Sequence, residues 1–252
     1  MRVKVFDPWF GPDRDVQVPE ERMTRMTNAR VAGFTFLFYI AVGITAMVLF
    51  GQATGGEGIA AKLASIAQHA TKVRLTVLLT LLEGLSALVL AVTLYAITRD
   101  QDPDLAMLGL TCRVAEGITG IFVARTLGLL WLATVDGADA PDAVAAHALG
   151  AFLLRMGAWN PGATFFAVGS TLFSWLLLRG RMVPVVLAWI GVLGSALAAV
   201  VLPLQLAGLI GGALTGLVWL PLLVFEVWLA LWLLIKGVAT PAGATPRRGE
   251  RG

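Results

Sequence analysis

Long apolar segments alternate with short polar ones along almost the whole chain. A helix needs about 20 residues, at about 1.5 Å per residue, to cross a hydrocarbon core about 30 Å thick, and six of the apolar segments have about this length or more. These segments cover residues 30–51, 73–98, 105–133, 161–178, 183–203 and 209–235. The pattern predicts an all-α fold: a polytopic transmembrane helix bundle with six spans, forming one membrane domain over residues 30–237.

The polar segments between the spans differ in length. Short turns at 99–104 and 179–184 predict two antiparallel helix hairpins, formed by spans 2 and 3 and by spans 4 and 5. The longer segment 51–72 repeats apolar residues at helical spacing, which predicts a short helix on the membrane surface. The segment 136–162 begins acidic and then becomes helical, and its Asn-Pro-Gly sequence should end that helix before span 4.

Composition and charge support a membrane protein. The chain has 252 residues, 58% hydrophobic and 14% charged, whereas soluble domains are roughly 45–50% apolar and about 25% charged. Basic residues gather before span 1, in the two short turns and after span 6, so the positive-inside rule places both termini in the cytoplasm. The sequence pI of about 9.4 therefore reflects topology. We expect the lipid bilayer as a partner and no nucleic acid.

The two ends of the chain are polar. Residues 1–29 have no apolar core followed by a cleavage site, so we expect a cytoplasmic N-terminal segment and no signal peptide. Residues 238–252 are rich in Pro, Gly and charge and are predicted to form a disordered cytoplasmic tail. Cys112 is the only cysteine, which excludes an internal disulfide.

Five ionisable side chains fall inside the predicted spans. They are Glu83, Arg113, Glu116, Arg125 and Glu226. A charge near the bilayer centre costs at least about 2.5–3.5 kcal/mol, so these side chains should face protein or trapped water. We therefore take all five as candidates for a ligand or proton pocket.

Span 3 carries three of these residues. Arg113 and Glu116 are close enough for an intrahelical pair, and they share a face with glycines that permit close helix contact. On a continuous helix Arg125 lies about 180° from Glu116, either reaching for the membrane interface or buried against protein. In the second case span 3 would be the central helix of the bundle.

The buried charges have two interpretations. They can neutralise one another and join the helices without any chemistry. Alternatively, they form a functional polar pocket, because three glutamates face only two arginines and one carboxyl group remains over. Burial disfavours the charged form of such a group, which makes it a candidate acid or proton carrier.

The two histidines are weaker candidates. His69 and His147 are both expected on the outer side, but they lack the spacing of a typical metal site. We therefore predict no metal site and no cofactor, and keep these two residues only as weak metal candidates.

Several segments resemble a known family. They include "NARVAGFTFLFYIAVGI" in span 1, "CRVAEG" in span 3, "GSTLFSWLLLRGRMVPVVLAWIGVLG" across spans 4 and 5, and "EVWLALWLLIKG" in span 6. Together with span 2 they resemble the bacterial membrane family called domain of unknown function 4386, over roughly residues 28–237. The resemblance implies a six- or seven-helix, multi-pass protein of the bacterial cytoplasmic (inner) membrane with no assigned role. It also implies recurrent charged positions at Arg74, Arg113, Glu116 and Glu226.

Three functions stay open at this point. The leading hypothesis is a protein with a central polar pocket that binds or moves a small or amphipathic ligand, with proton coupling. The second is a membrane-embedded enzyme in which a buried glutamate acts as general acid on a lipid or isoprenoid. The third is a structural or accessory subunit of a larger complex. The sequence names no substrate and does not define an oligomeric state.

Overall fold

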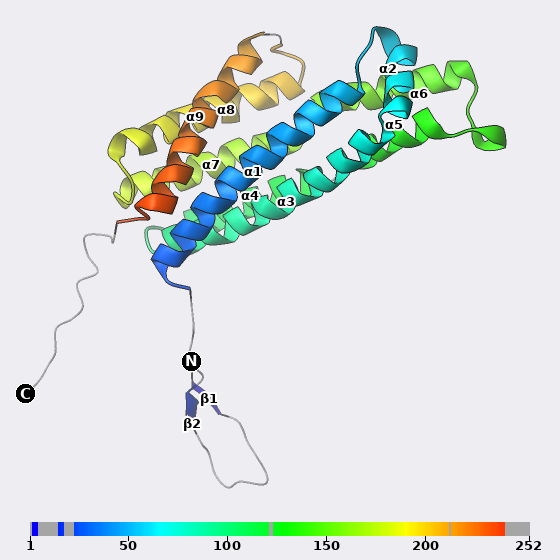
Figure 1. The fold of residues 1–252 in the computed structure, drawn as a ribbon. Coiled ribbons are helices and arrows are strands. Elements are labelled where there is room, and N and C mark those ends of the chain that lie inside the picture. The colour runs from blue at the N-terminus through cyan, green and yellow to red at the C-terminus, as the bar shows by residue number, and fades with distance from the viewer. Residues whose placement is uncertain (1, 5–14, 18–22, 121–122, 212, 240–252) are drawn as a thin grey trace, which may run out of the picture.

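A computed structural model describes residues 2–4, 15–17, 23–120, 123–211 and 213–239. In these ranges the chain is mostly helical (Figure 1). The elements are β1 (Arg2–Lys4), β2 (Asp15–Gln17), α1 (Arg25–Ala53), α2 (Gly58–Gln68), α3 (Ala70–Thr98), α4 (Pro103–Gly120), α5 (Ala124–Thr134), η1 (Gly137–Asp139), α6 (Ala143–Arg155), η2 (Met156–Ala158), α7 (Pro161–Arg179), α8 (Val185–Leu206) and α9 (Ala213–Ile235).

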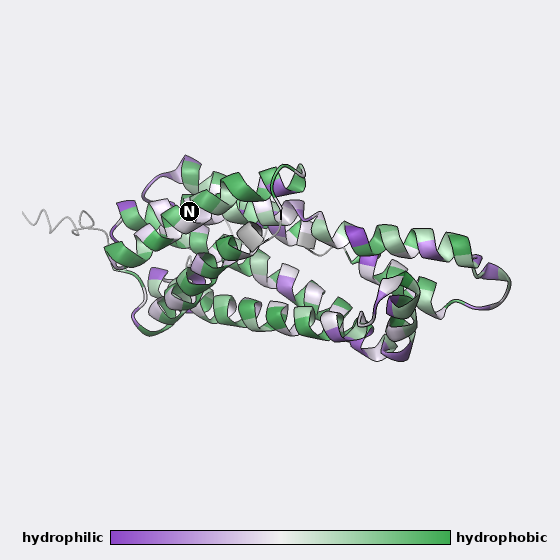
Figure 2. Ribbon diagram, turned by 90° about the horizontal axis from the view of Figure 1, so that it is seen from above, coloured by the Kyte–Doolittle hydropathy of each residue, from purple (hydrophilic) through white to green (hydrophobic). Residues whose placement is uncertain are grey.

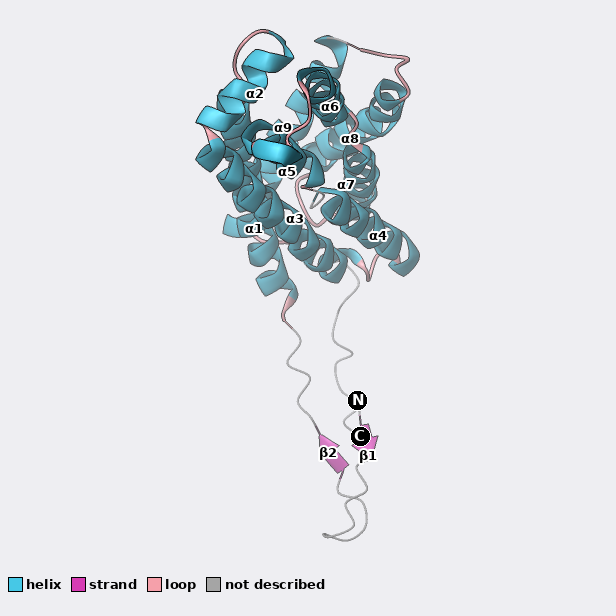
Figure 3. Cartoon of the chain, turned by 90° about the vertical axis from the view of Figure 1, so that its right-hand side faces the viewer, coloured by secondary structure: helices cyan, strands magenta, loops and turns pink. Residues whose placement is uncertain are grey.

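The predicted class of fold is confirmed. Within the described residues, six helical segments are long and apolar enough to cross a membrane. Green, hydrophobic positions dominate these helices in Figure 2, whereas purple, hydrophilic positions concentrate in the connections. The prediction of an all-α chain omitted β1 and β2, which pair antiparallel with Arg2 opposite Gln17 and lie outside the bundle (Figure 3).

The spans form a closed ring. The principal contacts run from α1 to α3, α3 to α4, α4 to α7, α7 to α8, α8 to α9, and from α9 back to α1. The hairpins expected from the two short turns are α3–α4 and α7–α8. Large hydrophobic side chains on the outside of the ring are exposed, as expected for surfaces that face lipid.

Local sequence explains where several helices begin. The Thr24 hydroxyl accepts a hydrogen bond from the backbone N–H of Thr27, at 3.1 Å, and so caps α1. Asn160 caps α7 in the same way, and Pro161 follows it at the first helical position, where a missing N–H is harmless. The Asn-Pro-Gly sequence therefore separates α6 from α7 as predicted.

Two of the spans differ in detail from the expected helices. The first helix starts at Arg25 and so includes part of the segment expected to precede it. The third span, Pro103–Thr134, is long and apolar enough to cross a membrane as predicted, but Val123, just before α5, has a ψ of 0° and is not helical. Most of the N-terminal segment and residues 240–252 of the predicted tail lie outside the described residues.

The third span is also not the central helix. The main neighbours of α4 are α3 and α7, and its outer face exposes Met107, Leu108 and Ile118. Each helix of a ring has a lipid-facing side, so a helix can carry buried charges on one face without being surrounded by protein.

The helices α2, α5 and α6 gather at the end of the bundle away from the start of α1, and we call them the distal cap (Figure 1). Ile66 of α2 and Leu129 of α5 are fully buried there, together with Ala53 and Val73 from the ends of α1 and α3. The surface helix predicted between spans 1 and 2 is α2, and its apolar side packs on protein in this cap.

Candidate functional site

The centre of the ring holds a buried ion pair. Arg113 and Glu116, both on α4, are only 1% and 6% exposed. Arg113 Nη1 lies 2.9 Å from Glu116 Oε2. The contact is an ion pair, and no hydrogen bond is formed by a guanidinium nitrogen within the described residues. The intrahelical pair of Arg113 and Glu116 that the sequence predicts is therefore present.

Aromatic rings surround the guanidinium. Its Cζ atom lies 5.0 Å from the centre of the Phe166 ring and 5.8 Å from that of Phe36. These distances are within the range of cation–π attraction. A Cβ atom built at Gly169 of α7 would lie 3.1 Å from Cγ and Cδ of Arg113, so the glycine makes room for the arginine stem. Helices α1 and α7 therefore both help to hold Arg113.

Tyr39 of α1 is a member of the site that the sequence prediction missed. Its hydroxyl donates a hydrogen bond to Glu116 Oε1, at 2.9 Å. The phenol is also close enough to Glu83, Arg113 and Glu226 to interact with them electrostatically. A signal was present, because the chain has only two tyrosines and this one lies deep inside a predicted span.

Glu226 reaches the same site from α9. It is 6% exposed and interacts electrostatically with both Arg113 and Glu116. Unlike Glu116 it has no salt bridge within 4 Å in the described residues, and its buried Oε1 atom has no hydrogen-bond partner there. Glu116 and Glu226 are thus equally buried, but Arg113 forms an ion pair only with Glu116.

Glu83 lies at the edge of this group. It is half-buried on α3, where it interacts electrostatically with Glu116. A Cβ atom at Gly43 of α1 would come within 2.8 Å of Glu83 Oε1, so the carboxyl group lies against the α1 backbone. We call Tyr39, Glu83, Arg113, Glu116 and Glu226 the polar cluster.

The polar cluster lies near the middle of the spans. Counted from the ends of α1, α3, α4 and α9 on the side where α1 begins, its residues are roughly 14–22 Å deep at about 1.5 Å per residue. For a hydrocarbon core about 30 Å thick this is close to the midplane.

Arg125 does not belong to the polar cluster. It lies on α5 in the distal cap, half-buried, with its guanidinium 4.9 Å from the centre of the Phe50 ring. It touches Gly157, where a methyl group would overlap Nη1. Among the described residues no carboxylate forms a salt bridge with it. The polar cluster therefore contains one arginine for three glutamates.

The remaining candidates lie elsewhere. His69 Nδ1 lies 2.9 Å from the carbonyl oxygen of Ser65, and His147 is exposed on α6. In the part of the chain that the structure describes, no three His, Cys, Asp or Glu side chains form a group able to hold a metal ion. Arg74 is exposed on α3, away from the polar cluster.

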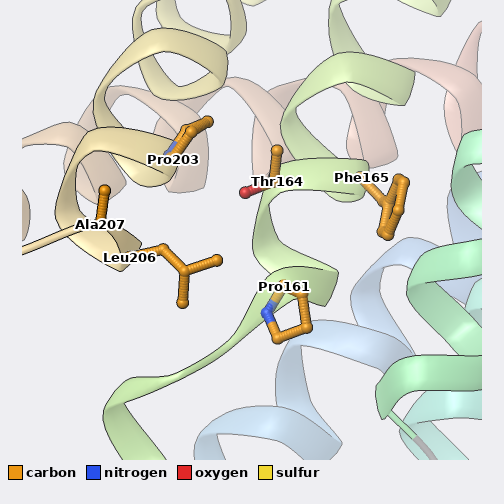
Figure 4. Close-up of a pocket in the computed structure, with 6 residues that line it drawn as sticks. All are labelled: Pro161, Thr164, Phe165, Pro203, Leu206 and Ala207. Atoms are coloured by element: carbon orange, nitrogen blue, oxygen red, sulfur yellow. The ribbon is translucent and has the colours of Figure 1, made fainter.

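A hollow of about 360 Å³ opens between the start of α7 and the end of α8 (Figure 4). Its walls are mainly apolar, and the hydroxyl of Thr164 lies between the two helices with no hydrogen-bond partner in the described residues. A second hollow of similar size lies on the outer face of α9. None of the glutamates lines either of these two hollows. The first is lined by Pro161, Thr164, Phe165, Pro203, Leu206 and Ala207. The second is lined by Leu223, Val224, Val227, Trp228 and Leu231.

The fold and the site define a class: a multi-pass helical membrane protein whose ring of spans encloses ionisable side chains. The chain belongs to the family described as Domain of unknown function (DUF4386), whose model matches residues 31–237. This confirms the family that the sequence resembles. No curated protein and no solved structure matches the chain.

Proposed function

We propose that this protein binds a small or amphipathic ligand inside the ring of spans and couples its binding or movement to protons. The observation that carries the proposal is the charge imbalance of the polar cluster, where Arg113 alone faces Glu83, Glu116 and Glu226. We further propose that it works in the cytoplasmic membrane of a bacterium, with both chain ends in the cytoplasm, as the distribution of basic residues indicates.

The physical reason is the cost of uncompensated charge. Arginine does not deprotonate in proteins, so the guanidinium neutralises one carboxylate. Two further ionised carboxylates near the midplane would each cost at least about 2.5–3.5 kcal/mol. Bound protons or a cationic group of a ligand would remove that cost. If a bound proton and the cationic group of a ligand replace one another at these carboxylates, binding of the ligand is coupled to release of the proton.

The geometry favours this hypothesis over the two alternatives. An enzyme acting on a lipid needs a carboxylic acid that its substrate can reach from the lipid, whereas Glu116 and Glu226 are each only 6% exposed. A purely structural role is best served by charges that pair fully with one another. Here the nitrogens of Arg113 and Oε1 of Glu226 lack hydrogen-bond partners in the described chain.

The test is transport in reconstituted membranes. The full-length protein is placed in proteoliposomes on a solid-supported electrode and exposed to a panel of organic cations, amino acids, sugars and carboxylates at acidic and at neutral pH. We expect at least one class to evoke a current that depends on pH. That current should disappear in Glu116→Gln and in Glu226→Gln, each of which removes one ionisable carboxyl group of the polar cluster with little change in shape.

The matched control is Glu57→Gln, since Glu57 is an exposed carboxylate in the loop before α2. It should leave every current unchanged. Absence of any current from the panel, or currents that persist in correctly folded Glu116→Gln and Glu226→Gln protein, would contradict the proposal.

A further inference from the structure

The contrast between Glu116 and Glu226 points to different roles for the two acids. They are equally buried, and both interact electrostatically with the guanidinium of Arg113. Glu116 has both the ion pair with Arg113 and the hydrogen bond from Tyr39, whereas Glu226 Oε1 has no partner in the described residues. A buried acid without a partner is far less costly when it is neutral.

We propose that Glu226 is the residue that takes up and releases the proton, and that Arg113 passes from Glu116 to Glu226 when the proton leaves. This inference rests on the proposed function, because it assigns roles within the same polar cluster. In the proton-bound state Arg113 and Glu116 pair within α4. In the proton-free state the proton has passed to water, Arg113 and Glu226 pair between α4 and α9, and the Glu116 carboxylate keeps the hydrogen bond from Tyr39.

Few other charges can take part in this exchange. The groups close enough to Glu226 to interact with it electrostatically are Tyr39 from α1, and Arg113 and Glu116 from α4. The other helix packed on α9 is α8, which contains no ionisable residue, and α7 has only Arg179 at its far end. Arg113 is therefore the one cation within the described part of these spans that can neutralise an ionised Glu226.

Within the described residues the ion pair with Glu116 is the only polar contact of the guanidinium. Its nitrogens form no hydrogen bond within the described residues, and its contacts with Phe36 and Phe166 are to ring faces, which hold it without fixing a direction. By contrast, close contacts hold the backbone of α9. A Cβ atom at Gly33 of α1 would lie 2.6 Å from the Ala230 carbonyl oxygen, and Gly191 of α8 leaves room for the Phe225 ring. The exchange is thus a movement of side chains.

Infrared difference spectroscopy of the full-length protein in lipid nanodiscs tests the inference. Stepping from acidic to alkaline pH should convert a buried carboxylic acid to carboxylate and remove its C=O band. The band should be absent in Glu226→Gln. It should also be absent in Glu116→Gln, although Glu226 is intact there, because Arg113 then pairs with Glu226 at every pH and keeps it ionised. The Glu57→Gln control should retain the band.

A second variant tests the same inference in case Glu116→Gln folds poorly. Tyr39→Phe keeps both carboxyl groups and removes only the hydroxyl that holds Glu116, so we expect a smaller band. A band that survives in Glu226→Gln, that disappears in Glu83→Gln instead, or that is unchanged in folded Glu116→Gln or in Tyr39→Phe would overturn the inference. None of these measurements needs a solute. If they showed that Glu226 does not carry the proton while solutes still evoked pH-dependent currents, the proposed function would stand and only this inference would fail.

Discussion

At the scale of single residues, the two buried arginines of the sequence have different environments. Arg113 is enclosed by protein and is the only cation of the polar cluster, whereas Arg125 lies half-buried against Phe50 in the distal cap. The same residue type at a similar position in a hydrophobic run thus neutralises an acid in one case and rests on an aromatic ring in the other.

Removing Arg113 should therefore be much more harmful than removing Arg125. Arg113→Ala leaves Glu116 buried without its cation, a change that typically costs about 3–5 kcal/mol. Arg125→Ala loses mainly a cation–π contact worth about 0.5–1 kcal/mol. Reversible unfolding in mixed micelles measures both, and equal losses of stability would show that Arg113 is not the essential counter-charge.

The hydrogen bond from Tyr39 should have a measurable energy of its own. In membrane proteins such bonds average about 0.6 kcal/mol and reach about 1.7 kcal/mol. We expect Tyr39→Phe to destabilise the protein by roughly 1 kcal/mol, and this loss should vanish when Glu116 is already glutamine. Additive effects in the double variant would mean that the hydroxyl and the carboxyl group do not interact.

At the scale of helices, glycines determine which pairs come closest. Gly117 of α4 faces the Gly84 carbonyl oxygen of α3, Gly109 faces the Phe173 ring of α7, and Gly33 of α1 lies against the backbone of α9. In lipid, where apolar side chains gain little by leaving the solvent, close packing of this kind supplies much of the helix association.

Gly33→Ala tests the most crowded of these contacts. The added methyl group would lie 2.6 Å from Ala230 O and from Leu234 N, both backbone atoms that cannot rotate away. We expect a loss of about 1–3 kcal/mol, typical of overpacking. Gly51→Ala, at a helical position with nothing within 4 Å, is the control and should be neutral or slightly stabilising. If Gly33→Ala left the stability unchanged while Gly51→Ala lowered it, the close contact at Gly33 would not be what holds α1 and α9 together.

At the scale of the whole molecule, an even number of spans puts both chain ends on one side of the membrane. Asp104 is exposed at the start of α4, and Ala140 is exposed in the loop between α5 and α6, at the opposite end of the bundle. The single native cysteine, Cys112, is buried and serves as background.

Cysteines at these two positions should therefore react differently in spheroplasts. A membrane-impermeant maleimide should label Ala140→Cys in intact spheroplasts and Asp104→Cys only after permeabilisation. Labelling in the reverse order would invert the expected orientation, and labelling of both or neither in intact spheroplasts would argue against the six-span arrangement.

The amino-acid sequence by itself determined the number of spans, most of their limits and the depth of the buried charges. Span length and apolar pattern are local properties, set by the thickness of the hydrocarbon core and by the rise of a helix. Glu83, Arg113, Glu116 and Glu226 were found in this way, because a charge in an apolar run is visible without any neighbour.

Only the tertiary structure decided which of these residues meet. The structure places Arg125 on Phe50 in the distal cap, and the ring of spans brings Tyr39 to Glu116 and Glu226 close to Arg113. These interactions join residues that are far apart in the sequence, Tyr39 with Glu116 and Arg113 with Glu226. Helical periodicity gives the face on which a side chain lies but not the helix that faces it, and that choice depends on packing across the whole ring.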